Sequence, residues 1–522
     1  MTDEVELSIV DFFKGRSLFI TGGSGFMGKV LVEKLLYCCP DVKNIFLLLR
    51  PKRDKQPNAR IEEMFKLPLF SRVRKEFPDA IKKIVVLHGD VTEDRLGLTP
   101  EQIQRLMKEV SVVFHFAATL RLEAKLKDAI QMNLTGTWRV LEMCKNMEQL
   151  KAFVHLSTAF CHCDQEDLEE RMYPCPYEPQ DLMRAIQWMD DTTLEMITPR
   201  LLKPHPNTYT FSKRLAEKLV ESYYPTLPVT IARPSIVTPT WHDPFPGWVD
   251  NLNGPIGLLV AGGKGVLRSM HVKGDSYSEV IPVDMAINGI IRIAWKNGIS
   301  KERPPEIPVY NVTASSVKRD TWAQILEKGR KYIYEYPFEM TVWYPDGNIR
   351  STKFMHNVCV IFLHFLPAYF IDFLMFIFRQ KRFMVRLQHR IQDGLEVLQY
   401  FTTRDWAFHS SKFMALFEHI TPKDKVHFDV DFSSVDEEDY LKNCIIGARH
   451  YCMKEDPKSL PRCRRNMKIL YVVDKVWSVL FYMFLLWLLV CCSDTARYCL
   501  DTASDYIKMM PVVRSIISHD AH

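Results

Sequence analysis

Short apolar runs alternate with longer segments of helical periodicity along the first half of the chain. Turns rich in glycine or polar residues bound each run, a pattern typical of strands that are buried on both faces. We expect such strands at 17–20, 45–49, 84–87, 112–116 and 152–156. The alternation of strands with helices predicts an α/β fold built on a Rossmann-type, doubly wound parallel sheet.

The turn after the first expected strand is rich in glycine. Gly22, Gly25 and Gly28 follow at intervals of three residues and lead into a helical pattern. The first glycine allows a tight turn, the second lets backbone N–H groups approach a pyrophosphate, and the third lets the helix pack closely on the sheet. This order of strand, turn and helix predicts a dinucleotide site. We assign three neighbouring residues to it as well: Thr21, Phe26 and Met27.

The second expected strand ends in a basic residue. Proteins that prefer NAD usually have Asp or Glu here, which binds the 2′-hydroxyl of the ribose. This chain has Arg50, followed by Pro51, Lys52 and Arg53. Because a guanidinium pairs well with a phosphate, the sequence favours NADPH as the cofactor. Solvation of a basic loop is the alternative.

Small or short polar residues follow the third and fourth expected strands. Asp90 and Val91 come after the third strand, and Ala117 and Ala118 after the fourth. Such residues leave room for an adenine ring and a ribose at the edge of the sheet, so we place all four at the cofactor site. Asp90 can equally cap the turn that follows it. Asn133, in a helical segment, either has a structural or water-holding role or is solvated.

Tyr209 and Lys213 are four residues apart in a segment of helical periodicity. They therefore lie on one face of a helix, one turn apart. An ammonium in this place can lower the pKa of the phenol, as general acid–base chemistry requires. The pair becomes specific only together with the glycine turn and with Ser157 and Thr158, which follow the fifth expected strand.

The motifs together resemble those of the extended short-chain dehydrogenases/reductases, and other segments resemble the alcohol-forming fatty acyl-CoA reductases. The resemblance covers nearly the whole chain, from about residue 12 to 455. The segments that carry it, besides the motifs above, are 154–159, 232–235, 253–268, 281–284, 404–408, 428–431 and 440–451.

The resemblance implies a catalytic set. The family's acid–base roles fall on Tyr209 and Lys213, and the hydroxyl partner falls on Thr158 rather than Ser157, because the second hydroxyl of such a pair usually fills this place. The implied reaction is the NADPH-dependent reduction of a long-chain fatty acyl-CoA to a primary fatty alcohol and CoA through an aldehyde. Release of the aldehyde is the nearest alternative. No metal is needed.

The resemblance also implies a division of the chain. We expect an NADPH-binding reductase domain at 12–300, a connecting segment at 301–353 and a mainly helical C-terminal domain at 354–455. The chain departs from the family pattern at Phe160, where Tyr is common, at His409-Ser410-Ser411, where Asn is usual, and at Glu437, where Trp is usual. These departures concern substrate fit and C-terminal packing rather than the catalytic set.

Composition changes this picture little. A length of 522 residues suits two to four domains, and a net charge of +5 is too mild to indicate nucleic acid. The 13 cysteines form no C-x-x-C pair, and the first residues have no basic and apolar signal pattern, so we expect reduced thiols in a cytosol-facing body. Cys161, His162 and Cys163 are better explained by packing than by a metal site. Nothing in the sequence indicates an oligomeric state.

Two strongly apolar segments indicate contact with membrane lipid. His364, Pro367 and Asp372 interrupt the segment 358–378, so we expect a hairpin on the membrane surface or an acyl-binding wall rather than a spanning helix. Domain core is the alternative.

The second apolar segment, 476–492, has no charge and belongs to a transmembrane anchor at 469–492. Asp474 and Lys475 leave an interfacial helix as the alternative. Basic residues precede the segment and predict a cytosolic catalytic body: Arg462, Arg464, Arg465 and Lys468. The endoplasmic reticulum is the first choice of membrane and the peroxisome the second.

Two other functions are compatible with parts of the sequence. A catalytically inactive lipid-binding or scaffold protein would keep the fold, but the catalytic residues are all present. A dehydrogenase acting on sugar or sterol hydroxyls would explain the glycine and tyrosine motifs, but neither the C-terminal domain nor the anchor.

Overall fold

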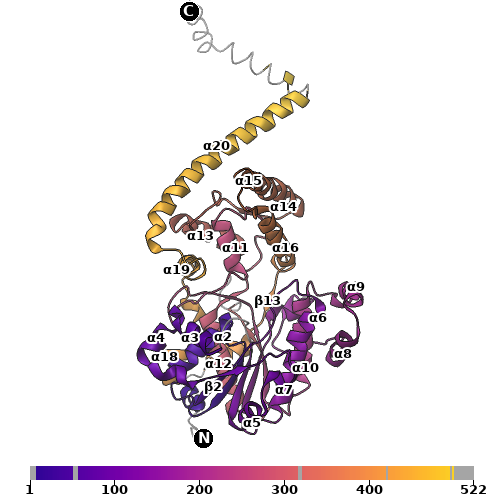
Figure 1. Cartoon of the computed structure of the whole chain (residues 1–522), viewed down its shortest axis with the longest axis vertical. Helices are drawn as coiled ribbons and strands as arrows, with labels where there is room; N and C mark the ends of the chain where they lie inside the picture. Colours follow the sequence, from indigo (N-terminus) through magenta and orange to yellow (C-terminus); the bar gives the residue numbers. More distant parts are fainter. Residues whose placement is uncertain are drawn as a thin grey trace, which may run out of the picture.

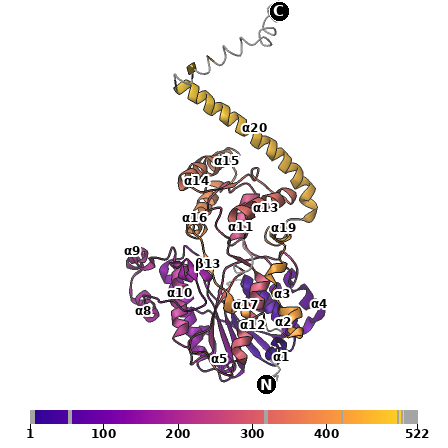
Figure 2. The same ribbon diagram turned by 180° about the vertical axis from the view of Figure 1, so that it is seen from behind.

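A parallel sheet with helices on both faces forms one end of the molecule, and a mainly helical lobe forms the other (Figures 1 and 2). A long helix leaves the helical lobe and points away from the body. The computed structural model describes residues 7–50, 57–314, 320–418, 421–493, 497, 498 and 502.

Within the described residues the central sheet has seven strands in the order β11-β7-β5-β4-β1-β2-β3, and all of them pair in parallel. The five strands expected from the sequence are confirmed as β1 to β5. Because the strand order reverses between β1 and β4, a ligand is expected beyond the carboxyl ends of these strands. The strands are β1 (Ser17–Thr21), β2 (Asn44–Leu49), β3 (Ile84–His88), β4 (Val110–His115), β5 (Ala152–Leu156), β7 (Val229–Pro234) and β11 (Val309–Val312).

Helices cover both faces of the sheet, as a doubly wound fold requires. One face carries α1 (Ile9–Phe13), α2 (Phe26–Cys38), α3 (Pro57–Lys66), α4 (Ser71–Glu76) and α12 (Val283–Ile299). The other carries α5 (Pro100–Glu109), α6 (Leu126–Ala129), the π-helical η4 (Ile130–Thr135), α7 (Gly136–Cys144), α8 (Pro179–Trp188), α9 (Asp191–Leu202) and α10 (Thr208–Glu221).

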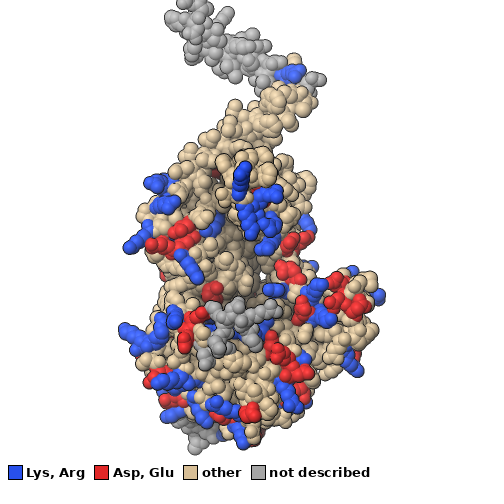
Figure 3. Space-filling model, viewed as in Figure 1, with Lys and Arg blue, Asp and Glu red and all other residues tan. Residues whose placement is uncertain are grey.

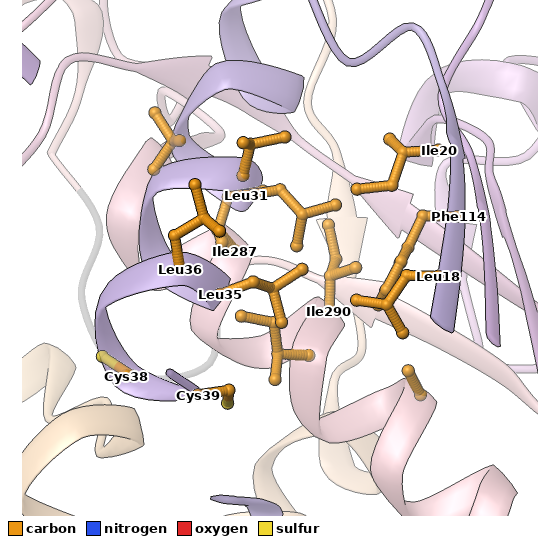
Figure 4. Packing of buried hydrophobic residues seen from close by; sticks show 14 of the residues in the cluster. Leu18, Ile20, Leu31, Leu35, Leu36, Cys38, Cys39, Phe114, Ile287 and Ile290 are labelled. Atoms are coloured by element: carbon orange, nitrogen blue, oxygen red, sulfur yellow. The ribbon is translucent and has the colours of Figure 1, made fainter. Parts of the chain in front are cut away.

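The core on the first face is made by branched aliphatic side chains. Leu18 of β1 and Leu31 and Leu35 of α2 are fully buried, and Ile287 and Ile290 of α12 pack beside them (Figure 4). Burial of each such side chain contributes about 1.5–3 kcal/mol, so this layer holds the glycine turn firmly against the sheet.

Segments far apart in the sequence build the helical lobe. Its elements are α11 (Pro255–Gly263), β9 (Ser269–His271), α13 (Trp322–Glu335), β12 (Asn348–Arg350), α14 (Lys353–Cys359), the π-helical η6 (Val360–Phe365), α15 (Leu366–Ile377), α16 (Met384–Thr402) and α19 (Glu437–Gly447). The short strands β8 (Ile236–Thr238) and β10 (Val280–Pro282) lie at its junction with the sheet. β6 (Asp167–Leu168) pairs with β13 (Ala407–Phe408), while α17 (Ser411–Ala415) and α18 (Pro422–Phe428) return to the sheet.

The segment 301–353, expected as a connection, is structured. It contains β11, which pairs with β7 and completes the sheet, and α13, which belongs to the helical lobe. The strand is short and follows a proline-rich stretch, so only its pairing with β7 identifies it as part of the sheet. The reductase fold therefore does not end at residue 300.

The expected C-terminal domain also packs partly on the sheet. Phe413, Phe428 and Phe432 join the core cluster that contains α12. The buried carboxylate of Glu170 accepts N–H groups from Asn311 (3.0 Å), Phe413 (2.9 Å) and Lys412. This side chain links the edge of the sheet to the C-terminal part, so the two are one packed body.

Two helical stretches among the described residues are long and apolar enough to cross a membrane, Lys353–Ile377 and Pro457–Cys492. The first contains α14 and α15, and the second contains α20 (Leu460–Cys492). Most of their large apolar side chains are exposed, which is unusual for the core of a soluble body.

Candidate active site

A crevice of about 910 Å³ opens at the carboxyl edge of the sheet. It lies where the strand order reverses, and its size is that of a cofactor site. The structure places twelve of the predicted residues along it: Gly22, Gly25, Phe26, Met27, Gly28, Arg50, Asp90, Val91, Ala117, Ala118, Thr158 and Tyr209.

The glycine turn has no room for side chains. Gly22 has φ +74°, and a Cβ there would lie 2.7 Å from the carbonyl carbon of Phe116. A Cβ on Gly28 would lie 2.3 Å from the carbonyl oxygen of Gly22. Gly25 caps the N-terminus of α2, whose first N–H groups have no partner within the helix. The turn and the helix dipole therefore suit an anionic pyrophosphate.

Thr21, which we assigned to the cofactor, does not line the crevice. It is fully buried, and its hydroxyl lies 2.8 Å from Nδ1 of His115 and accepts the N–H of Ala117 at 3.2 Å. The last residue of this buried strand points into the packing of the sheet, and its hydroxyl fixes the start of the loop after β4.

Basic residues lie at the end of the crevice near β2. Arg50 is largely exposed, with its Nε 3.9 Å from Oδ2 of Asp90. Arg60 of α3 also lines the crevice and donates to the carbonyl oxygen of Arg50 at 2.6 Å. We did not predict Arg60, because a basic residue on a helix ten positions further along resembles a solvated side chain. Pro51, Lys52 and Arg53 lie outside the described residues.

Asp90 caps the turn that follows β3 and also lies along the crevice. Its Oδ1 accepts the N–H of Thr92 at 3.0 Å, which caps the turn after β3, and its side chain also lines the crevice. Together with Arg50 it forms the polar boundary of this end of the site.

The hydroxyl groups of Thr158 and Tyr209 reach the crevice from two elements. Thr158 follows β5, and Tyr209 lies in the first turn of α10, which Asn207 caps by accepting the N–H of Thr210 at 2.9 Å. Ser157 lines the crevice as well. The structure thus brings the predicted hydroxyl pair to the glycine turn, from parts of the chain about 130 to 190 residues away.

Lys213 does not line the crevice. It is buried, and its Nζ donates to the carbonyl oxygen of Leu156 at 2.7 Å. Burial lowers the pKa of Lys213 to about 8, and the nearby Glu217 carboxylate opposes this shift. The ammonium therefore lies beneath the end of β5 that carries Ser157 and Thr158.

The pKa of Tyr209 differs from our expectation. Burial raises it well above the usual value for a phenol, while a hydrogen bond with Thr158 acts in the opposite direction. Lys213 donates to backbone and does not produce the lowering that we expected. The phenol is consequently protonated at neutral pH, which is the form that can donate a proton.

Asn133 has a structural role. It is fully buried in η4, and its Oδ1 accepts the N–H of Thr119 at 2.8 Å. Its Nδ2 donates to Oγ of Ser212 at 2.9 Å. The amide thus holds the loop that contains Ala117 and Ala118 against α10, and the solvated alternative is excluded.

Cys161 and His162 approach a third group of ligand type, Glu217. Nε2 of His162 lies 2.9 Å from the Glu217 carboxylate, and Arg233 donates to it from Nε at 2.9 Å and Nη2 at 2.7 Å. Since a buried guanidinium already neutralises the carboxylate, the arrangement is an ion-pair network that joins α10 to β7. Cys163 points elsewhere, with its Sγ 3.5 Å from Nδ1 of His205.

The departures from the family pattern lie away from the crevice. The Phe160 ring packs edge-on against Phe401, Trp406 and Phe408 of the C-terminal part. Glu437, at the start of α19, pairs with Lys328 of α13. Both concern the packing of the helical lobe.

The fold and the crevice together define a nicotinamide-dependent oxidoreductase of the extended short-chain type. The NAD-binding model of the male sterility protein family matches residues 20–290, and a second model described as male sterility protein matches 363–455. Fatty acyl-CoA reductase 1 of Gallus gallus is 34% identical over 94% of this chain and 95% of its own length. Fatty acyl-CoA reductase 2 of Mus musculus is also 34% identical, with the same coverage.

The chain therefore belongs to the fatty acyl-CoA reductase family. Solved structures confirm the fold. The terminal reductase domain of the myxalamid biosynthetic pathway is 18% identical with a TM-score of 0.55, over 84% of this chain and 91% of that domain. The reductase domain of a nonribosomal peptide synthetase from Mycobacterium tuberculosis is 16% identical with a TM-score of 0.54, over 86% and 95%.

Proposed function

We propose that the protein reduces a long-chain fatty acyl-CoA to a primary fatty alcohol in two steps, with NADPH as the hydride donor and an aldehyde between the steps. Membership of the family supports the reduction of acyl-CoA to fatty alcohol. The observation that carries the mechanism is that Thr158 and Tyr209 line the same crevice as the glycine turn.

The residues of the crevice fit a dinucleotide phosphate. The turn at Gly22 and Gly28 would be filled by any Cβ, which leaves backbone N–H groups to face a pyrophosphate. Arg50 and Arg60 supply two guanidinium groups at the end of β2, where the adenosine ribose lies in this fold. They support NADPH over NADH, because a 2′-phosphate pairs with a guanidinium.

Two molecules of NADPH, bound one after the other, would each supply one hydride to the carbonyl carbon, the first to the thioester and the second to the aldehyde. In the first step the Thr158 and Tyr209 hydroxyls donate hydrogen bonds to the carbonyl oxygen as it becomes negative. CoA leaves as the thiolate, and the carbonyl forms again as an aldehyde. In the second step Tyr209 gives its proton to the oxygen of the reduced aldehyde, which yields the alcohol.

Lys213 acts as a positioning residue in this proposal. Its ammonium holds the carbonyl oxygen of Leu156, next to Ser157 and Thr158, and lies one helical turn from Tyr209. A positive charge beneath the site favours negative charge on the substrate oxygen, and the hydrogen bond fixes the end of β5.

We assign α20 as a single membrane anchor with the catalytic body on the cytosolic side. Asp474 is buried against the helical lobe, where it accepts a hydrogen bond from Nε1 of Trp343 at 2.7 Å and lies 3.3 Å from Arg268. The apolar part after Asp474 bears exposed Trp and Leu side chains. Figure 3 shows the helix leaving the body with a surface almost free of charged residues. Its length is in the range of about 17–25 residues that a bilayer core needs.

The basic residues before α20 support this orientation by the positive-inside tendency. The endoplasmic reticulum is our first choice of membrane and the peroxisome our second. Protection of the residues after α20 from added protease, while the body is digested, is the expected result in sealed vesicles. Release of the full chain by alkaline carbonate would contradict the anchor.

The apolar helix that runs from α14 through η6 into α15 is continuous, and the chain turns back only into α16. We propose that this helix lies on the same membrane surface. Asp372, which made a spanning helix costly, accepts N–H groups from Phe383 (3.0 Å), Met384 (2.9 Å) and Val385 (3.1 Å) and so caps α16. The outer side of α15 is apolar and exposed. Its neighbours include five exposed basic residues that suit anionic headgroups: Arg379, Lys381, Arg382, Arg386 and Arg390.

Figure 3 shows a group of basic side chains on the helical lobe in the region of α14 to α16. Their conversion to serine should weaken the binding of the body to vesicles that contain anionic lipid, and leave binding to neutral vesicles unchanged. Equal binding of both forms to anionic vesicles would exclude the surface role.

The reaction can be tested with membrane fractions that contain the full chain, NADPH or NADH, and acyl-CoAs of graded length. Fatty alcohol should form with NADPH, and Tyr209→Phe should abolish most of it. Aldehyde alone would show that the reaction stops after the first step. The absence of both products at every chain length would favour the scaffold function.

A further inference from the structure

A second hollow, which the mechanism above does not use, lies in the helical lobe. A cavity of about 200 Å³ opens between α11, α13 and α19, with β9 and β12 at its side. Apolar side chains such as Ile256, Leu259 and Leu326 line most of it. Such walls suit a hydrocarbon and no charged ligand.

The two arginines at the cavity have partners elsewhere. Nη2 of Arg268 donates to the Asp346 carboxylate at 2.8 Å, and Nη2 of Arg330 donates to the carbonyl oxygen of Gly347 at 2.9 Å. The hydroxyl of Tyr440 is bonded to Oγ1 of Thr238 at 2.7 Å. The polar groups of the lining are thus engaged with protein atoms, which leaves the interior apolar.

The cavity adjoins the crevice. Pro255, the first residue of α11, lines both hollows. Ile236 and Val237 of β8 line the crevice, and Thr238 of the same strand lines the cavity. A molecule with its reactive carbonyl beside Tyr209 can therefore extend an apolar chain past β8 into the helical lobe.

Two glycines keep part of this space open. Gly329 is buried in the middle of α13, yet a Cβ there would meet no atom within 4 Å, and the same holds for Gly262 near the end of α11. Glycine disfavours a helix relative to alanine, and no close packing requires it at these positions. Gly263 is different, because its Cβ would lie 2.7 Å from the ring of Phe338.

We propose that this cavity binds the acyl chain of the substrate and that Gly262 and Gly329 set the chain length that the enzyme accepts. The inference rests on the proposed function, since it assigns the apolar part of the same substrate. A side chain added at Gly329 would occupy the space of the chain and displace its terminal methylenes.

The test compares Gly329→Phe with Gly394→Phe in the full membrane-bound chain. Gly394 is the matched control, because it is a helical glycine of α16 whose Cβ would also meet no atom within 4 Å, and it does not line the cavity. Initial rates of alcohol formation are measured with NADPH and a graded series of saturated acyl-CoAs. Gly329→Ala is included because alanine favours the helix and so keeps the fold.

Gly329→Phe should leave the rate on short acyl-CoAs near that of the wild type and lower kcat/KM on long ones, by about fourfold for each methylene that finds no room. Gly329→Ala should give a smaller shift in the same direction, and Gly394→Phe none. If both Gly329 variants kept the wild-type dependence of kcat/KM on acyl chain length, the inference would be overturned. The proposed function would still stand, provided that fatty alcohol is formed. No alcohol or aldehyde from the wild type would overturn both.

Discussion

The crevice and the cavity are lined by different kinds of atoms. Main-chain atoms of the glycine turn and the ends of parallel strands shape the crevice, and polar side chains such as Tyr209 and Arg50 complete it. Side chains from three helices shape the cavity, and nearly all of them are apolar. The crevice can therefore hold charge and direct chemistry, whereas the cavity can only select by size.

This difference separates rate from selectivity. A change in the crevice should affect every acyl chain alike, because each substrate brings the same thioester to the same hydroxyl groups. A change in the cavity should affect substrates in proportion to their length. Because the crevice and the cavity adjoin at Pro255, the two ends of one substrate can occupy them at the same time.

Replacement of Tyr209 by Phe should have the largest effect. Loss of the proton donor and of one hydrogen bond to the developing oxyanion should lower kcat by about 10²–10⁴-fold. The loss should be the same for every chain length, which initial rates across an acyl-CoA series will show. Tyr223→Phe is the control, because the Tyr223 hydroxyl bonds Glu142 away from the crevice. If the loss of kcat in Tyr209→Phe depended on acyl chain length, the separate roles of the crevice in rate and of the cavity in chain-length selection would be contradicted.

Replacement of Gly28 by Ala should follow in size. The added Cβ would lie 2.3 Å from the carbonyl oxygen of Gly22, so α2 must move away from the turn. We expect a loss of about 1–3 kcal/mol in the free energy of unfolding and a large rise in KM for NADPH. Thermal unfolding with and without NADPH measures both. Gly394→Ala is the control: its Cβ would meet no atom within 4 Å, so neither the free energy of unfolding nor KM for NADPH should change. If Gly28→Ala also left both unchanged, the role of the glycine turn in binding the pyrophosphate would be contradicted.

Removal of the basic residues beside β2 should affect the choice of cofactor. The double variant Arg50→Ala with Arg60→Ala loses charge-assisted hydrogen bonds of about 1.5–3 kcal/mol, so KM for NADPH should rise by roughly 10- to 150-fold. KM for NADH should change little, because NADH lacks the 2′-phosphate. Steady-state rates with each cofactor give the ratio. A parallel rise for both cofactors would show that the arginines support the loop only.

The smallest effect expected is on pH dependence. The pKa of Lys213 is about 8, so the ammonium becomes a neutral amine as pH rises through this value. The positive charge beneath the site is then lost, so kcat/KM should fall above this pH and level off at the lower activity of the neutral amine. Lys213→Arg, which stays charged, should shift this limb upward. A profile that stays flat until the phenol itself ionises would remove the lysine charge from the mechanism.

The crevice was largely predictable because its determinants are local. Each glycine of the turn acts on residues within the same strand, turn and helix, and Tyr209 and Lys213 share one helix, so spacing alone indicates their relation. Spacing does not tell which way a side chain faces. The structure places the hydroxyl of Thr21 against His115 and Ala117, outside the crevice lining, and Lys213 beneath the site rather than in it.

The cavity was not predictable for the opposite reason. Its walls come from residues between 238 and 444, and no short pattern marks Gly262 or Gly329 as open space. Arg60 and β11 were missed in the same way, since only the packing of α3 beside β2 and of β11 beside β7 gives them a place. The apolar character of 358–378 is plain in the sequence, but the pattern does not show that Asp372 accepts the N–H groups at the start of α16.

Transfer of deuterium from cofactor to product tests the central claim most directly. With NADPH deuterated at both C4 positions, the alcohol should carry two deuterium atoms on its hydroxyl-bearing carbon, one from each reduction, and any released aldehyde should carry one. Mass spectrometry of the products measures this. Alcohol without deuterium at that carbon would contradict hydride transfer in the crevice and, with it, the two-step reduction.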